Sequence, residues 1–259
     1  MKLMINHQTH YQYTETAKNS IQYIKMTPQS NSHQNVLSWA VSVPGTQSTH
    51  FDAFNNVWLT ASQRFSYQNM TIMAQGTVDI NINSKFAIDL DIRPSIFLQK
   101  TPSTMCNREM LEFAQQHVPV VSYSNLVKLS EALLQRMPYL SYATGVYTTA
   151  IHAFEYSQGV CQDHSHVFIA MCKALGIPAR YASGYLYVPD TSHLASHAWA
   201  EVFIDNHWHS FDVSNQIYTP SSHIYVAIGR DYWDVSPVRG VREKGGIENM
   251  FSTVQVLPC

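Results

Sequence analysis

In the N-terminal third of the chain, short runs rich in Tyr, Ile and Thr alternate with turn residues such as Pro44-Gly45. Runs of this kind are typical of β-strands, and several of them with regular turn signals predict an all-β domain, a sandwich or a barrel. We expect this domain to end near Ile92, and we expect a turn at 14–19 between its first two strands. The predicted strands cover residues 2–13, 20–27, 36–43, 57–60, 64–73 and 76–82.

After residue 93 the apolar residues recur at helical spacing, and four leucines in 124–136 fall on one face of a predicted helix. Extended runs return further along, so the second part is predicted to be α+β. We therefore predict two domains, 1–93 and 94–259, divided where the pattern changes. The predicted helices are 104–117, 124–136 and 148–157, the predicted strands are 179–188, 197–204 and 207–213, and a loop is predicted at 189–196.

A further helix is predicted from the almost entirely apolar stretch between Val167 and Leu175, which indicates burial on most sides. It should begin at Cys161. Gly176 suits the left-handed position just past a helix end, and Pro178 forbids continuation. The chain is therefore predicted to be organised around this buried helix.

Cys161 stands at the first turn of the buried helix, just after Gly159. The free N–H groups and the dipole of a helix N-terminus favour an anion, so they favour the thiolate form of a cysteine placed there. The same N–H groups can donate to an oxyanion that forms beside the sulfur. Cys172 lies about three turns deeper on nearly the same face, at roughly 1.5 Å per residue, and is predicted to be a small buried apolar residue.

Asp205-Asn206 is predicted to be a hairpin turn between the strands 197–204 and 207–213. If the turn has two residues, His197 and Asp212 are diagonal neighbours on one face, roughly 7–8 Å apart and within reach of a side-chain hydrogen bond. A three-residue turn would place them on opposite faces. The sequence thus permits a Cys161–His197–Asp212 arrangement of nucleophile, base and a carboxylate that orients the base.

Composition and net charge argue against some classes of binding partner. The net charge is −2 and only 13% of the residues are charged, which gives no basic field for nucleic acid or an anionic membrane. No run is long enough to span a membrane, and the N-terminal apolar run is too short for a signal peptide. The 4 cysteines show no paired spacing and suggest reduced thiols. We expect a cytoplasmic protein whose oligomeric state is undetermined.

Several residues of metal-ligand type stand close together in the sequence, but their spacing does not favour a metal site. On a helix only Cys161 and His164 would share a face. No Cys-x-x-Cys or His-Glu-x-x-His pattern supports zinc, and no carboxylate-rich loop supports calcium. We therefore predict no metal and no other cofactor, with metal binding by the histidine-rich segments as a minor alternative. The residues are Cys161, Asp163, His164, His166, His193, His197, His207 and His209.

Four ordered segments stand out: 159–166 (GVCQDHSH), 175–185 (LGIPARYASGY), 197–202 (HAWAEV) and Trp208 with Phe211-Asp212. Together they resemble the transglutaminase-like superfamily. The resemblance extends over nearly the whole chain, because the N-terminal region is similar to the β-rich domain of bacterial members and 223–237 is similar to their C-terminal segment. It implies a papain-like α+β core with Cys161 as nucleophile, His197 as base and Asp212 as the residue that orients the base.

The chain departs from the family pattern at two places. The residues from Asp212 to Asn215 read Asp-Val-Ser-Asn where the family commonly has Asp-Pro-Thr-Asn. His164 and His166 stand where larger apolar or small residues are more usual. Neither change removes a residue of the predicted arrangement.

These residues predict a cysteine-dependent acyl-transfer enzyme that forms a thioester at Cys161 from a peptide or glutamine-type amide. Water would then give hydrolysis, and a primary amine would give a cross-link. We favour hydrolysis, as in a cysteine protease or amidase, because no lysine-binding site can be identified. The expected partner is a peptide or protein amide. The alternatives are an amine-accepting transglutaminase and a non-catalytic binding module of the same fold.

Overall fold

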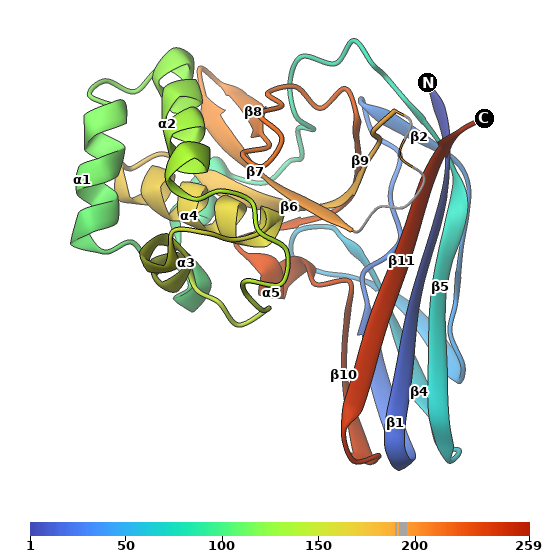
Figure 1. The fold of residues 1–259 in the computed structure, drawn as a ribbon. Helices are drawn as coiled ribbons and strands as arrows, with labels where there is room; N and C mark the ends of the chain where they lie inside the picture. The colour runs from blue at the N-terminus through green and yellow to red at the C-terminus, as the bar shows by residue number, and fades with distance from the viewer. Residues whose placement is uncertain (190, 192–195) are drawn as a thin grey trace.

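The computed structural model describes residues 1–189, 191 and 196–259, so the predicted loop 189–196 lies largely outside the described residues. A long curled antiparallel sheet stands beside a compact core of helices around a second, smaller sheet (Figure 1). The predicted α+β class is confirmed, and the N-terminal sheet is a half-barrel. No helix within the described residues is long and apolar enough to cross a membrane.

The half-barrel is built around its longest strand, β1 (Lys2–Ile24). On one side β1 pairs first with β5 (Tyr67–Ile80) and then with β4 (Val57–Gln63). On the other side it pairs first with β11 (Glu248–Pro258) and then with β10 (Val238–Lys244). Two more strands extend the sheet beyond β5 and β4, namely β2 (Gln34–Ser42) and β3 (Thr46–Phe51).

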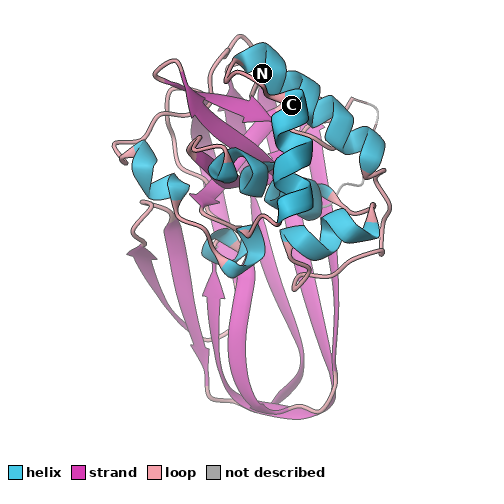
Figure 2. Ribbon diagram, turned by 90° about the vertical axis from the view of Figure 1, so that its left-hand side faces the viewer, coloured by secondary structure: helices cyan, strands magenta, loops and turns pink. Residues whose placement is uncertain are grey.

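The turn predicted at 14–19 is a sharp bend inside one continuous strand. The register of β1 shifts against β5 between Gln12 and Ala17, and Asn19 takes a φ of 45°. The strands on either side of β1 are also interrupted at this bend, so the whole sheet folds over there. The hydrogen-bonded pairing of β1 continues on both sides of the bend, with β4 and β10 beyond it. Both halves of β1 consequently return to the core, and the folded end extends past the helices (Figure 2).

Apolar side chains fill the space between the two halves of the folded sheet, including Tyr11, Ile24 and Ile72. The predicted strands 64–73 and 76–82 are one strand, β5, and the sequence pattern did not predict β3. All six side chains of β3 are exposed, so no apolar alternation marks this strand in the sequence.

The end of the chain completes the half-barrel. Strands β10 and β11 run antiparallel to β1 along most of its length, and Leu3 stands opposite Pro258. The sequence pattern assigns this segment to the second predicted domain, 94–259. The pairing means that both termini lie at one end of the same sheet (Figure 1).

The central helix α4 (Cys161–Ala174) begins where the sequence predicts, and its side chains from Asp163 to Lys173 are buried. Leu3 and Ile5 of β1 belong to the same apolar cluster as Phe168 of α4, so one continuous core joins the half-barrel to the helices. The other helices are α1 (Arg108–His117), α2 (Tyr123–Arg136), α3 (Ala150–Tyr156) and α5 (Tyr232–Val235), with 3-10 turns η1 (Pro94–Leu98) and η2 (Pro102–Thr104).

The smaller sheet has the strand order β8-β7-β6-β9 and packs against α4 through β6 and β7. Its strands correspond to the extended segments that the sequence predicts after the central helix, with β9 added at the edge. Their bounds are β6 (Ala179–Leu186), β7 (His197–Ile204), β8 (His207–Phe211) and β9 (His223–Gly229).

Side chains from the N-terminal region cover the free edge of β9. Gln34 accepts from Tyr225 N at 2.7 Å and donates to Tyr225 O at 2.8 Å. Asn56 likewise accepts from Ile228 N at 2.9 Å and donates to Ile228 O at 2.8 Å. These amides replace the hydrogen bonds of a missing strand and fix β9 to the half-barrel.

Candidate active site

Cys161 is the first residue of α4, and its side chain is only partly buried. The helix start is held by Asp163, whose Oδ2 accepts from Val160 N at 2.8 Å and from the Thr144 hydroxyl at 2.5 Å. A side chain at Gly159 would collide with Asp163, because its Cβ would lie 2.6 Å from the Asp163 Cβ. Glycine and aspartate therefore fix the turn that presents Cys161. The N–H groups of the first turn have no intrahelical acceptor and can donate to an oxyanion.

The hairpin at Asp205-Asn206 has the predicted two-residue connection. Ile204 pairs with His207, and the two turn residues take φ values of 52° and 62°, as a type I′ turn requires. This register places His197 and Asp212 on the same face, as expected from their diagonal relation.

His197 and Asp212 are joined directly. His197 Nε2 donates to Asp212 Oδ2 at 2.7 Å, and the carboxylate side chain is fully buried. Asn215 adds a side-chain donor to the same oxygen at 2.9 Å and a backbone donor to Oδ1 at 3.2 Å. The change from Pro-Thr to Val213-Ser214 in the family pattern thus leaves the support of the carboxylate intact.

The charges of the site favour an ion pair between His197 and Asp212. Burial alone lowers the pKa of His197, but the hydrogen bond and charge of Asp212, together with Cys161, raise it to about 10. Burial raises the pKa of Asp212, but its contacts with His197 and His223 outweigh burial and hold that pKa well below its ordinary value. At neutral pH His197 is therefore an imidazolium between Asp212 and the sulfur, able to donate a proton.

Sequence reasoning missed His223. It is fully buried on β9, and its Nε2 donates to Asp212 Oδ2 at 3.1 Å. The His223 carbonyl accepts from His33 Nε2 at 2.8 Å, so the N-terminal region holds this histidine in place. The pKa of His223 is lowered, chiefly by burial. The only signal in the sequence was its position at the start of the segment 223–237, which gives no distance to Asp212.

His164 and His166 are structural. His164 Nε2 donates to Met137 O at 2.7 Å, and its Nδ1 accepts from the Ser214 hydroxyl at 2.8 Å. The two departures from the family pattern are therefore in contact. His166 Nε2 accepts from Tyr232 N at 3.1 Å, and burial lowers the pKa of this imidazole to about 4.

Among the described residues, the one group of three ligand-type side chains close enough to share a metal ion is His197, Asp212 and His223. Both imidazole Nε2 atoms face the carboxylate. A metal ion at this position would replace the Nε2 proton that His197 donates to Asp212, so it would break the hydrogen bond that orients the imidazole. His193 lies outside the described residues.

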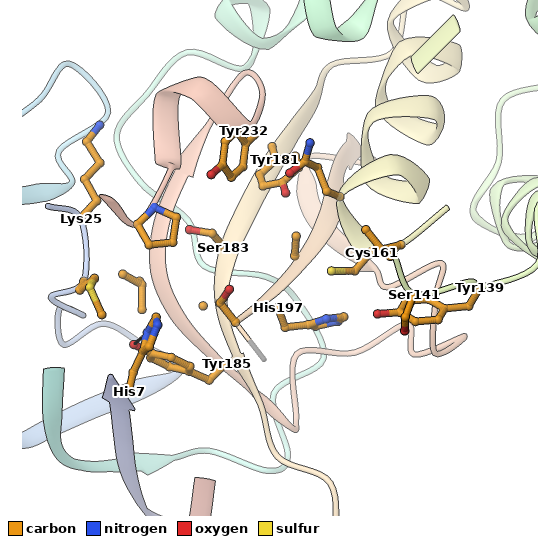
Figure 3. Close-up of a pocket in the computed structure, with 18 of the residues that line it drawn as sticks. His7, Lys25, Tyr139, Ser141, Cys161, Tyr181, Ser183, Tyr185, His197 and Tyr232 are labelled. Carbon is orange, nitrogen blue, oxygen red and sulfur yellow. Dashed lines mark hydrogen bonds between the residues drawn. The ribbon is translucent and has the colours of Figure 1, made fainter. Parts of the chain in front are cut away.

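A cavity of about 350 Å³ opens beside Cys161, between the core and the half-barrel (Figure 3). Its volume falls in the range of small-ligand and side-chain sites. Cys161 and His197 line it from α4 and β7, and Figure 3 shows His7 and Lys25 on the side opposite Cys161. Five tyrosines also contribute to the wall: Tyr139, Tyr142, Tyr181, Tyr185 and Tyr232.

Comparison with known proteins agrees with this architecture. Residues 114–213 match the sequence profile of the transglutaminase-like superfamily, and residues 3–79 match that of the bacterial transglutaminase-like N-terminal region. These matches confirm the resemblance predicted from the sequence.

The similarity to known proteins extends over nearly the whole chain. An uncharacterized protein of Mycobacterium leprae is 27% identical over 98% of both chains, and one of Mycobacterium tuberculosis is 23% identical over 92% of this chain and 86% of its own. A structure from Cytophaga hutchinsonii, described as that of a candidate cysteine protease, superposes with a TM-score of 0.80 at 21% identity and covers 100% of this chain and 91% of its own. At that identity the structural likeness establishes the fold alone.

Proposed function

Since residues 114–213 form a core of the transglutaminase-like superfamily, we propose that this protein is a cysteine-dependent hydrolase of peptide or glutamine-type amides. The observation that supports it is the arrangement of Cys161 at the start of α4 with His197 and Asp212, in which a 2.7 Å hydrogen bond orients the imidazole. A thiol, an acid–base group and a group that orients it are the parts that covalent acyl transfer requires.

In the acylation step the Cys161 thiolate attacks the amide carbonyl and forms a C–S bond. The carbonyl oxygen becomes an oxyanion, which the N–H groups at the start of α4 can stabilise. His197 then donates its proton to the leaving nitrogen, the C–N bond breaks, and a thioester and a free amine remain. Asp212 stabilises the imidazolium before this step and keeps the ring in the same orientation afterwards.

In the second step the neutral His197 takes a proton from water as the oxygen attacks the thioester. The C–S bond breaks, a carboxylic acid leaves and the Cys161 thiolate is restored. Among the described residues that line the cavity there is no Asp or Glu, so no carboxylate there can form an ion pair with the ammonium group of a lysine acceptor. This charge pattern favours water over an amine as acceptor.

Mass spectrometry of peptides in ¹⁸O-labelled water, with and without methylamine, tests the proposal. We expect ¹⁸O in the acid product, an acyl adduct on Cys161 in the intact protein, and little methylamide. The Cys161→Ala variant is the matched control and should give no product. A methylamide as the main product would support the amine-accepting alternative, and an inert thiol would support the binding module.

A further inference from the structure

The half-barrel closes the active-site cavity on the side away from the nucleophile. His7 from β1, together with Lys25 and Met26 just after β1, lines the same cavity as Cys161. Because the sheet folds over at 14–19, both halves of β1 reach this wall. We call the part of the cavity lined by His7, Lys25, Met26, Ser183 and Tyr185 the acyl chamber.

Lys25 is the cation of this wall, and its ammonium group forms an ion pair on the side away from the cavity. Lys25 Nζ lies 2.5 Å from Asp52 Oδ2 and 2.5 Å from Asp234 O. The Lys25 ammonium and the Asp52 carboxylate are both largely buried. Figure 3 shows the amino group of Lys25 pointing away from Cys161.

The remaining polar groups of the chamber are neutral. His7 is buried, and its Nδ1 lies 3.1 Å from the Tyr185 hydroxyl while its Nε2 lies 2.9 Å from the Ser252 hydroxyl. Burial lowers the pKa of His7 to about 4 and raises that of Tyr185, so both groups are uncharged at neutral pH. The hydroxyl of Ser183 is close to the Val235 carbonyl, at 3.4 Å.

We propose that the acyl chamber binds a large uncharged side chain next to the scissile carbonyl and excludes charged side chains. A charged group entering it would lose hydration and would meet no free counter-charge among the residues that define the chamber. Apolar atoms would contact Met26 and the Tyr185 ring, and an amide could bond to the hydroxyl groups. This inference rests on the proposed hydrolysis and names the class of its substrate.

Isosteric peptides test the proposal. The probes are acetyl-Ala-Ala-X-Ala-Ala-amide with X as Gln, Glu, norleucine or Lys, so each charged residue has a neutral partner of similar shape. We expect kcat/KM for cleavage of the main-chain bond after X, counted apart from any loss of the Gln side-chain amide, to be at least about tenfold higher for Gln than for Glu, and for norleucine than for Lys. Equal rates within either pair, or a preference for Glu, would overturn the proposal.

Binding separates this inference from the proposed reaction. The same four peptides are titrated against Cys161→Ala, in which binding needs no turnover. Tighter binding of both neutral peptides supports the acyl chamber even if the wild-type protein proves inactive, in which case only the hydrolase is refuted. Equal binding, or no binding of any peptide, overturns the acyl chamber.

Two substitutions of Met26 test whether the substrate side chain binds at this wall of the cavity. Met26→Phe reduces the space in the chamber and should raise KM for norleucine several-fold more than for X as Gly, whereas Met26→Leu should change the two alike. Thermal melting establishes that both variants fold. An equal change for norleucine and Gly in a folded Met26→Phe variant would contradict a side-chain site at this wall.

Discussion

His223 donates from Nε2 to Asp212 Oδ2 at 3.1 Å, to the same oxygen that His197 contacts at 2.7 Å. Asp212 is therefore held by a second histidine from the opposite edge of the smaller sheet. Since β9 is fixed to the half-barrel through its backbone, the position of the carboxylate depends on residues far from it in the sequence.

Replacing His223 with Phe should lower kcat about tenfold or more without a matching change in KM, because the carboxylate loses a donor and some of its fixed position. That donor helps to depress the pKa of Asp212, so the acidic limb of the pH profile should move to higher pH. His223→Gln retains a side-chain donor and should recover part of the activity. An unchanged pH profile in a folded His223→Phe variant would show that His223 only fills space.

Adding one Gly between Asp205 and Asn206 should abolish most activity. The insertion shifts the faces of the downstream strand and moves Asp212 away from His197, unless a bulge absorbs it. We expect activity to fall at least as far as in Asp212→Ala, with the thiol and the imidazole still present. Circular dichroism and turnover are measured together, and a folded insertion variant with wild-type turnover would contradict the register argument.

The two cysteines of α4 should separate chemistry from stability. Cys161→Ala should abolish turnover and leave the melting temperature nearly unchanged, because this side chain is only partly buried. Cys172 is fully buried, and Cys172→Ala should cost about 1 kcal/mol in the free energy of unfolding. Of these two thiols, iodoacetamide should label Cys161 and leave Cys172 unlabelled, since Cys172 is buried and burial raises the pKa of its thiol. The opposite pattern would mean that the nucleophile is misassigned.

The His197–Asp212 contact should make stability depend on pH in the alkaline range. The pKa of His197 is raised from 6.5 to about 10 in the folded protein. Its stabilising effect is therefore fully present below about pH 6.5 and is lost as the pH rises through about 10. Urea unfolding of the wild type and Asp212→Asn across this range checks the sign. The stability difference between them should shrink as the pH rises, and a constant difference would contradict the ion pair.

Features that depend on neighbouring residues could be predicted from the sequence. The apolar stretch after Cys161 and the Gly176 stop specify α4, and Asp205-Asn206 specifies a two-residue turn because both residues tolerate positive φ. A turn of known length fixes the register of its two strands, so the pairing of His197 with Asp212 could be predicted from spacing alone.

The contacts between distant segments could not be predicted from the sequence and are seen in the folded protein. Strands β10 and β11 complete the sheet of β1, and His223 reaches Asp212 from an edge strand that the N-terminal region holds in place. The bend at 14–19 brings His7 and Lys25 to one cavity with Cys161. These contacts join residues that are far apart along the chain, and their free energy comes from burial and hydrogen bonds formed only after folding, so no local pattern of residues encodes them.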